Sequence, residues 1–366
     1  MTQAIPANDQ AAISLSVLIP NYNYARYIGE TIQSVLHQAS PEVEIVVTDN
    51  ASTDTSVDVV RACDDERIRL EVNPCNVGFS ANLERAASLA RGRRMLLLSS
   101  DDRMKDGAIA AYDRLEAALG PLAERAVWGA GTTVIDSNGA QTGEMPADRK
   151  LWRDAPIDPE LTKAVGYPVR AMPAPEILKR SLELLRTPLP FATTCYPKAM
   201  HDEVGGYSGG RLMNPDKWFL WKLLGVADMV YVIDAPLFEY RIHGSGQVVQ
   251  ESKSGALKHL TDQYIATFNI PDATLTKVGL EREALARAFI EQDIALRGLV
   301  ALSDGNRETA RRSVYFGYAA YPSLARKNPK VWLLRALITL GPVGIKLARA
   351  SRKRAQAAWQ AREIRR

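Results

Sequence analysis

The sequence predicts an α/β fold, in which a sheet flanked by helices is followed by a C-terminal helical extension. Two observations lead to this prediction. As far as Gly120, short apolar runs alternate with longer segments whose apolar residues recur at helical spacing. This alternation is typical of βαβ units and a parallel sheet. From Thr276 onward only the helical spacing remains, which predicts the extension.

Composition places the chain among ordinary globular proteins. Of its 366 residues, 46% are hydrophobic and 24% are charged, which excludes collagen-like, disordered and disulfide-scaffold classes. No Lys or Arg precedes the first apolar run, so we expect no secretory signal. No uncharged apolar stretch has the length of a membrane span. The three cysteines form no Cys-x-x-Cys pair, and their low number suits the reducing cytoplasm.

The individual elements follow from local patterns. Short apolar runs predict four buried strands, at Leu15–Ile19, Val43–Val47, Ile68–Val72 and Met95–Leu98. Helical spacing predicts helices at residues 28–36, 79–90 and 106–119. Val127–Ile135 followed by Asn138-Gly139 predicts a hairpin. Residues 141–175 are predicted to form a loop region. Two more strands, Phe191–Tyr196 and Met229–Ile233, are predicted on either side of a helix at residues 218–224.

Polar side chains follow three of the predicted strands, at residues 21–23, 49–54 and 99–102. Ligands of parallel sheets bind at this edge. The strongest signal is the pair Asp101-Asp102, because adjacent carboxylates repel each other unless a cation or a proton lies between them. A divalent ion held by one or two carboxylates and by substrate phosphates is a common solution. The competing interpretation is a helix cap, but a cap would lie next to the helix start near Asp106.

Three further clusters each allow two interpretations. The segment 49–54 has side chains that can bond a base or a ribose, and the same residue types form turns and N-caps. Asp216 follows a glycine-rich segment at 205–210 and precedes Trp218. It is either a general base or an ordinary acid at a helix N-terminus. His243, at the end of a predicted strand, either completes a metal site or is structural.

Taken in order, these motifs resemble the family 2 glycosyltransferases, inverting enzymes with the nucleotide-sugar-binding GT-A fold. The resemblance covers residues 14–250 and rests on six motifs, which are Val17–Asn23, Glu44–Asp54, Asn76–Asn82, Leu98–Asp102, Gly205–Tyr207 with Asp216, and Tyr240–His243. It implies a catalytic domain at 14–250, with a nucleotide-binding half (14–125) and an acceptor half (126–250). A helical extension (251–325) and a basic tail (326–366) would follow.

The resemblance also implies a role for each matching residue. Nucleotide-binding roles are implied for Pro20, Asn21, Tyr22, Asp49, Asn76, Ser100 and Asp101. A divalent metal, Mg²⁺ or Mn²⁺, would be held by Asp101, Asp102 and His243, and Asp216 would take the proton from the acceptor hydroxyl. The chain departs from the family pattern at two places. Ser99 replaces the first acid of Asp-x-Asp, and Asn214-Pro215 precede Asp216 where many relatives have an acid.

The implied activity is transfer of a sugar from a nucleotide-sugar donor to a hydroxyl of a glycan or a lipid-linked acceptor, as in polysaccharide biosynthesis. One carboxylate would act as general base, and a cation would neutralise the charge that develops on the leaving diphosphate. The first 325 residues carry 34 basic and 41 acidic side chains, which favours a metal over Lys and Arg for that task. The alternative is a non-catalytic relative that binds a nucleotide sugar or a glycan, and Ser99 is the feature that favours it.

The C-terminal tail differs in charge from the rest of the chain. From Arg326 to Arg366 it has 12 Lys and Arg and one acid. Because the positive charge is confined to the tail, we expect no nucleic-acid partner. Apolar residues at 331–340 followed by basic ones are typical of a segment that lies on an anionic membrane. A terminal helix docked on the protein with a solvated basic end has the same pattern. We expect a cytoplasmic protein, attached peripherally to the inner face of the plasma membrane in the first case.

Overall fold

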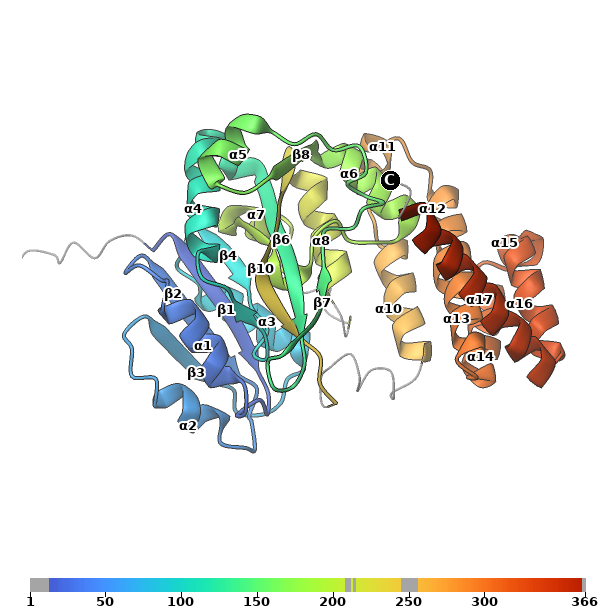
Figure 1. The fold of residues 1–366 in the computed structure, drawn as a ribbon, viewed down its shortest axis with the longest axis horizontal. Coiled ribbons are helices and arrows are strands. Elements are labelled where there is room, and N and C mark those ends of the chain that lie inside the picture. Colours follow the sequence, from blue (N-terminus) through green and yellow to red (C-terminus); the bar gives the residue numbers. More distant parts are fainter. Residues whose placement is uncertain (1–12, 208–211, 213–214, 245–255, 364–366) are drawn as a thin grey trace, which may run out of the picture. The chain divides into compact units, whose positions relative to one another are not determined.

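The computed structural model describes residues 13–207, 212, 215–244 and 256–363, and it divides the chain into two compact units (Figure 1). The first unit comprises Met1–Ile177 and Thr187–Ile242. The second comprises Leu178–Arg186 and His243–Arg366. The domain boundary that the sequence predicts at residue 250 falls within residues 245–255, which are outside the described residues.

The first unit is built on a mixed sheet with the strand order β3-β2-β1-β4-β9-β6-β10-β5. Its strands are β1 (Leu15–Asn21), β2 (Val43–Asp49), β3 (Ile68–Val72), β4 (Arg94–Leu97), β5 (Arg103–Met104), β6 (Ala126–Ile135), β7 (Gln141–Met145), β8 (Val169–Pro173), β9 (Cys195–Pro197) and β10 (Met229–Arg241). β1 is parallel to β2 and β4, and β2 is parallel to β3, which confirms the predicted parallel arrangement of this half. β9 is antiparallel to β4 and β6, and the hairpin of β6 and β7 forms as predicted.

Helices cover both faces of this sheet. They are α1 (Ile28–Leu36), α2 (Ser56–Arg61), α3 (Phe79–Leu89), α4 (Ala108–Leu119), α5 (Pro159–Val165), α7 (Lys198–Glu203) and α8 (Asp216–Val226), with 3-10 turns η1 (Gly120–Arg125) and η2 (Phe191–Thr193). The odd-numbered residues of β1 share one core with Ile28 and Ile32 of α1 and with the buried side of α4. Successive strand residues point to opposite faces. α3 contacts β1 and β2, and its buried Leu83 is not part of that core. α3 therefore covers the opposite face.

β1 continues past its predicted end, through Pro20 to Asn21. The N–H of Leu98 donates to the carbonyl of Leu18, so Leu18 and Pro20 direct their backbone groups to the β4 side. β4 pairs with β1 only from Leu15 to Leu18. Since no strand remains opposite Pro20 on that side, its missing N–H costs no ladder bond, and the strand continues.

The prediction of a loop region at 141–175 is wrong, because this segment contains β7, α5, β8 and the start of α6 (Ala174–Leu184). These elements are too short for a hydrophobic period to show. The start of α5 could still have been found, because Asp158 caps the N–H of Leu161 and Pro159 is at the first helical position, a common N-terminal pattern. The strand predicted at Phe191–Tyr196 is the turn η2 followed by β9.

The second unit is helical, as the spacing predicts. Its elements are α10 (Ala256–Phe268), α11 (Asp272–Lys277), α12 (Arg282–Phe289), the π-helical stretch η3 (Ile290–Leu296), α13 (Arg297–Ser303), α14 (Arg307–Ala320), α15 (Pro322–Lys327), α16 (Pro329–Thr339) and α17 (Pro342–Glu363). Phe289 is fully buried and packs against the rings of Tyr264, Phe316 and Tyr321. This unit therefore has an aromatic core of its own. In the part of the chain that the structure describes, no helix is long and apolar enough to cross a membrane.

Candidate functional site

Three strands end at one edge of the sheet in the first unit. β1 ends at Asn21, its parallel neighbour β2 ends at Asp49, and these two residues are paired in register. β4 lies on the other side of β1, and the chain continues from it into Asp101-Asp102. Carboxyl ends of parallel strands form the usual ligand-binding edge of such sheets. The polar clusters predicted from the sequence thus lie at this edge.

Asp49 is fully buried, and its carboxylate organises the turn after β2. Oδ2 accepts hydrogen bonds from the Asn21 amide and the Ser52 hydroxyl, both at 2.7 Å. Oδ1 accepts the N–H of Ser52 at 2.8 Å. Pro20 is buried within β1, whereas Tyr22 is exposed. In this structure Asp49 supports the turn, and Tyr22 is the residue of this cluster that is open to a base.

A network of amides connects the turn after β2 with the loop before α3. The exposed Asn76 accepts the side-chain N–H of Asn50 and the N–H of Gly78 through its Oδ1, each at 2.9 Å. Asn50 in turn accepts the N–H of Val77 at 2.9 Å. These bonds give the two loops a defined shape without any ligand.

Two residues of these loops have a left-handed backbone although neither is glycine, namely Asn23 (φ 59°) and Ala51 (φ 60°). This conformation costs roughly 1–2 kcal/mol per residue, and it persists where surrounding contacts enforce it. The Oδ1 atom of Asn23 accepts the N–H of Thr53 at 2.7 Å, and its own N–H donates to Ser52 at 2.9 Å. Backbone strain of this kind is concentrated at ligand sites.

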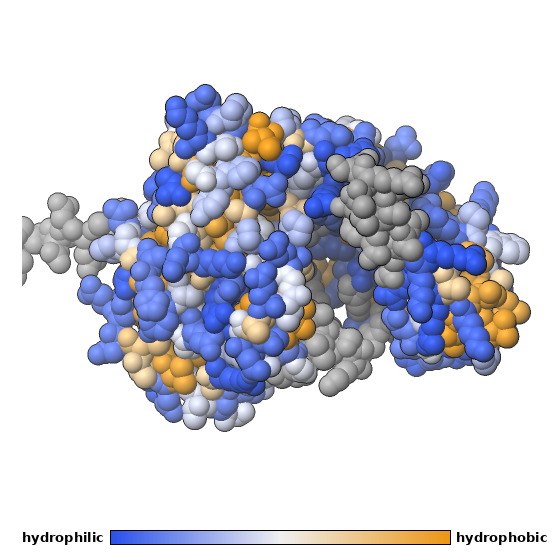
Figure 2. All heavy atoms as spheres, viewed as in Figure 1, coloured by the Kyte–Doolittle hydropathy of each residue, from blue (hydrophilic) through white to orange (hydrophobic). Residues whose placement is uncertain are grey.

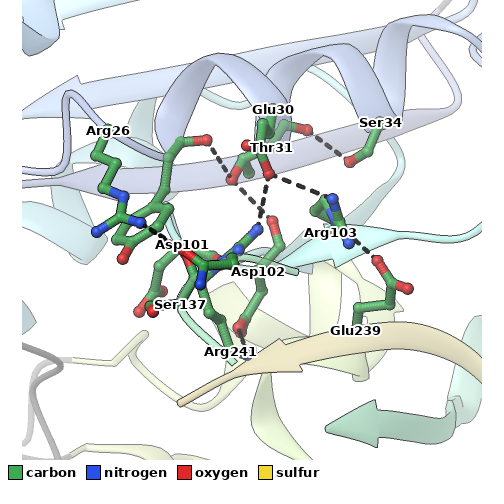
Figure 3. Close-up of polar contacts among 12 residues, drawn as sticks. Arg26, Glu30, Thr31, Ser34, Asp101, Asp102, Arg103, Ser137, Glu239 and Arg241 are labelled. Carbon is green, nitrogen blue, oxygen red and sulfur yellow. Dashed lines mark hydrogen bonds and ion pairs between the residues drawn. The ribbon is translucent and has the colours of Figure 1, made fainter. Parts of the chain in front are cut away.

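The two members of the acidic pair have different environments. Asp102 is buried, and its Oδ1 accepts the N–H of Arg241 at 2.8 Å (Figure 3). Burial, and next the charge of Asp101, raise the pKa of the Asp102 carboxyl well above its usual range. The hydroxyl of Thr31 lies 2.8 Å from the Asp102 carbonyl and 3.0 Å from that of Ser100. Asp102 is thus a structural anchor of the loop, and Asp101 is the half-buried member that reaches the surface.

Arg241 is the residue of this site that the sequence analysis missed. Its guanidinium is 1% exposed and donates to the carbonyl of Asp101 and to the carboxylate of Glu30, both at 2.8 Å. The guanidinium also lies over the ring of Tyr27, 4.7 Å from its centre. Arg241 therefore holds the loop that presents Asp101. The sequence signal that could have identified Arg241 is a cation at the end of a largely apolar strand.

The residues present are compatible with a metal that is held mainly by a substrate. Among the described residues, no group of three or more His, Cys, Asp or Glu side chains is placed to hold an ion. Asp101 offers a partly exposed carboxylate, while Asp102 already binds Arg241. A hard divalent cation is commonly bound by one or two carboxylates and completed by substrate phosphates and water. The donor set fits that mode, in which Asp101 is the available protein ligand.

Asp216 is the first residue of α8 and is half-buried. Earlier in the chain, Gly206 and Tyr207 are held by two charged side chains. Glu84 of α3 accepts the N–H of Tyr207 at 2.8 Å, and Lys222 of α8 donates to the carbonyl of Gly206 at 2.6 Å. Gly206 has a φ of 66°, and a Cβ there would come within 2.5 Å of the Glu84 carboxylate. Asn214 and most of the glycine-rich segment lie outside the described residues.

His243 is buried and is the first residue of the second unit after the division at Ile242. It lies two positions after Arg241, which is the last residue of β10. Its role as a ligand of an ion at Asp101 stays a prediction.

Residues 16–139 match a family model described as glycosyl transferase family 2. Residues 16–139 are therefore similar to the family 2 glycosyltransferases. The matched residues include Asn21, Asp49, Asn76 and the acidic pair, and they end before Asp216.

Relatives of this chain are known from several bacteria. The chain is 35% identical over 113 residues to a putative teichuronic acid biosynthesis glycosyltransferase, TuaG, of Bacillus subtilis, covering 30% of this chain and 42% of that protein. It is 25% identical over 289 residues to an uncharacterized glycosyltransferase of Nostoc sp., covering 74% of this chain and 80% of the relative. The Escherichia coli enzyme WfaP, a UDP-Glc:alpha-D-GlcNAc-diphosphoundecaprenol beta-1,3-glucosyltransferase, is 33% identical over 88 residues, covering 24% of this chain and 35% of WfaP.

The fold has a counterpart among solved structures. TarS residues 1–349 of S. aureus, in complex with UDP-GlcNAc, superimpose with a TM-score of 0.58 at 16% identity, covering 93% of this chain and 92% of that one. At this identity the similarity concerns the fold. The architecture is thus the GT-A-like α/β fold, with helices following the sheet as expected.

Proposed function

We propose that this chain is a metal-dependent inverting glycosyltransferase that moves a sugar from a nucleotide-sugar donor to a hydroxyl of a glycan or lipid-linked acceptor. The single observation that supports it most is the shared edge of β1, β2 and β4. That edge lies within the residues that match the family model and brings a preformed polar turn and a partly exposed carboxylate to the place where parallel sheets bind ligands. WfaP acts on a diphosphoundecaprenol-linked acceptor by its name, which supports a lipid-linked acceptor here.

The donor nucleoside would lie against the turns after β1 and β2. Tyr22 offers an exposed ring for a base, and Asn76 an exposed amide. The buried amides and carboxylates beneath them keep these groups in place before the donor arrives, which lowers the entropy cost of binding.

Asp101 would hold the divalent ion together with the donor diphosphate. Such an ion supplies positive charge that stabilises the diphosphate as it leaves. The protein's contribution is orientation. Arg241 and Thr31 bond the carbonyls of residues 100–102 and so hold the backbone from which the Asp101 carboxylate extends.

Asp216 would remove the proton of the acceptor hydroxyl. The carboxylate belongs to the first residue of a helix whose next turns are buried. Lys222 of that helix bonds the carbonyl of Gly206, whose neighbour Tyr207 bonds Glu84. Direct attack by the deprotonated hydroxyl on the anomeric carbon breaks the bond to the diphosphate from the opposite side, so the configuration inverts.

Two substitutions separate donor binding from transfer. Asp101→Asn should abolish the Mn²⁺-dependent rise in melting temperature that UDP produces, because the ion loses its protein ligand. Asp216→Asn should keep that rise and lower UDP release from UDP-sugars, assayed with a polyprenyl-diphosphate-linked sugar, by roughly 10²–10⁴-fold. The matched controls are Asp106→Asn and Asp228→Asn, whose side chains are exposed. If the wild type binds UDP but releases no more of it than Asp216→Asn does, the non-catalytic alternative holds.

A further inference from the structure

One apolar face of α16 packs inside the second unit. Val331, Leu334, Leu337 and Ile338 of α16 are buried, and α16 contacts α14, α17 and η3. They are part of the apolar stripe at 331–340 that the sequence analysis considered for a membrane surface. The structure divides this stripe, because these four residues belong to the core of the helical unit. Any surface function therefore depends on the residues that stay exposed.

A second set of apolar residues lies on the outside of α16 and α17. Figure 2 shows apolar residues gathered over α16 and the first turns of α17. The exposed ones are 49–61% accessible and are Trp332, Leu333, Leu340, Val343 and Leu347. We call this set the α16–α17 face. Single exposed apolar residues are normal, but a cluster on adjacent helices marks an interaction surface.

The charge around the α16–α17 face is of one sign. From Arg326 to Arg354 the sequence has nine Lys and Arg and no acid. Some of these cations are paired within the unit, since Lys330 bonds Glu291 and Arg352 bonds Asp304. Lys346, Lys353 and Arg354 are exposed and have no ion pair with any described residue. Apolar side chains are thus flanked by unneutralised positive charge.

We propose that the α16–α17 face binds an anionic lipid surface, with Leu333, Val343 and Leu347 entering the interface and Lys346, Lys353 and Arg354 at the headgroups. Charge complementarity selects this occupant. A symmetric contact with a second copy would bring the same cations against each other, which is repulsive. Exposed leucine and valine gain little from a nucleic-acid backbone, whereas they leave water when they enter a bilayer interface. This inference goes beyond the proposed function and does not depend on sugar transfer.

The test is sedimentation of the full chain with vesicles of phosphatidylcholine alone and with phosphatidylglycerol added. We expect at least about tenfold stronger binding to the anionic vesicles, since each cation near the surface contributes about fivefold. Two double variants address the two parts of the face. V343D/L347D should lose this binding at least tenfold, and K346E/K353E should lose it in proportion to the charge removed.

The controls are Leu122→Asp and Lys163→Glu, both exposed on the first unit, and they should bind as the wild type does. Unchanged melting temperatures would show that the variants are folded. V343S/L347S, which keeps all charges, should also bind less, and unaltered binding by it would overturn the proposal, because attraction would then be purely electrostatic. Equal binding to neutral and anionic vesicles, or a concentration-dependent dimer that V343D/L347D abolishes, would overturn it as well.

Discussion

At the scale of single residues, Arg241 connects the parts of the donor site. Its side chain bonds the Asp101 carbonyl and Glu30, and its backbone N–H bonds Asp102. A cation this deeply buried requires several partners to offset its loss of hydration. The N–H bond and the positive charge of Arg241 also favour the ionised form of the Asp102 carboxyl, against the effect of burial. In the proposed function, Arg241 is therefore a positioning residue, which would act on the ion and the donor through Asp101.

Arg241→Met should weaken Mn²⁺ binding in the presence of UDP by about 10–100-fold, as residues that orient metal ligands commonly do. The expected kinetic signature is a lower kcat that excess Mn²⁺ partly restores, which a merely destabilised protein would not show. The measurement is a Mn²⁺ titration of turnover and of UDP binding. Arg85→Met serves as the control because Arg85 forms an exposed pair with Glu71, and an equal loss in that variant would contradict the assignment.

At the scale of elements, α3 connects distant segments of the first unit. Asn82 donates to the carbonyl of Thr48 at 2.8 Å, near the end of β2. Two other residues of α3 bond the segment before α8, where Ser80 donates to the carbonyl of Leu212 at 2.7 Å and Glu84 accepts the N–H of Tyr207 at 2.8 Å. One helix of three turns thus sets the position of both segments.

Glu84→Ala should lower the free energy of unfolding by about 1–3 kcal/mol, because it leaves the N–H of the buried Tyr207 without an acceptor. Glu84→Gln retains an acceptor and should recover most of that loss. Urea unfolding of the two variants measures the difference, with the exposed Glu124→Ala as control. Equal losses for Ala and Gln would mean that the charge of Glu84, rather than its bond to the turn, is what matters.

At the scale of the whole molecule, the chain has two compact units with separate cores. The first is centred on residues of β1, β2, α1 and α4, and the second on Phe289 and the rings around it. Each unit has the hydrophobic core that a domain needs in order to fold cooperatively. The residues proposed for the nucleotide all lie in the first unit.

Calorimetry should therefore resolve two unfolding transitions. UDP with Mn²⁺ should raise only one of them, because a ligand stabilises the unit that binds it, by about 2.7 kcal/mol at a hundred times its dissociation constant. Phe289→Ala should lower the other, since truncating a buried phenylalanine costs about 3–5 kcal/mol. A single transition that responds to both changes would show that the units unfold together.

Local patterns in the sequence determined much of this protein. Up to Gly120, apolar runs and helical spacing located the longer strands and helices to within one or two residues, because their period is visible. The short α2 and β5 were not found by these patterns. The order of polar motifs at strand ends indicated the resemblance to family 2 glycosyltransferases, which the match of residues 16–139 supports, and it predicted the edge of the sheet at which these motifs lie. Both kinds of information are local in the chain.

Only the tertiary structure decided which polar and apolar residues are buried. It placed Asp49 and Asp102 inside hydrogen-bond networks, and it brought Arg241 from a distant strand to Asp101. It also assigned Leu334 to the core and Leu333 to the surface. Each assignment depends on which element packs against which, and spacing along one segment contains no information about the partner that covers it. The sequence thus determined the chemistry that the edge of the sheet can perform, and packing decided which side chains are available to perform it.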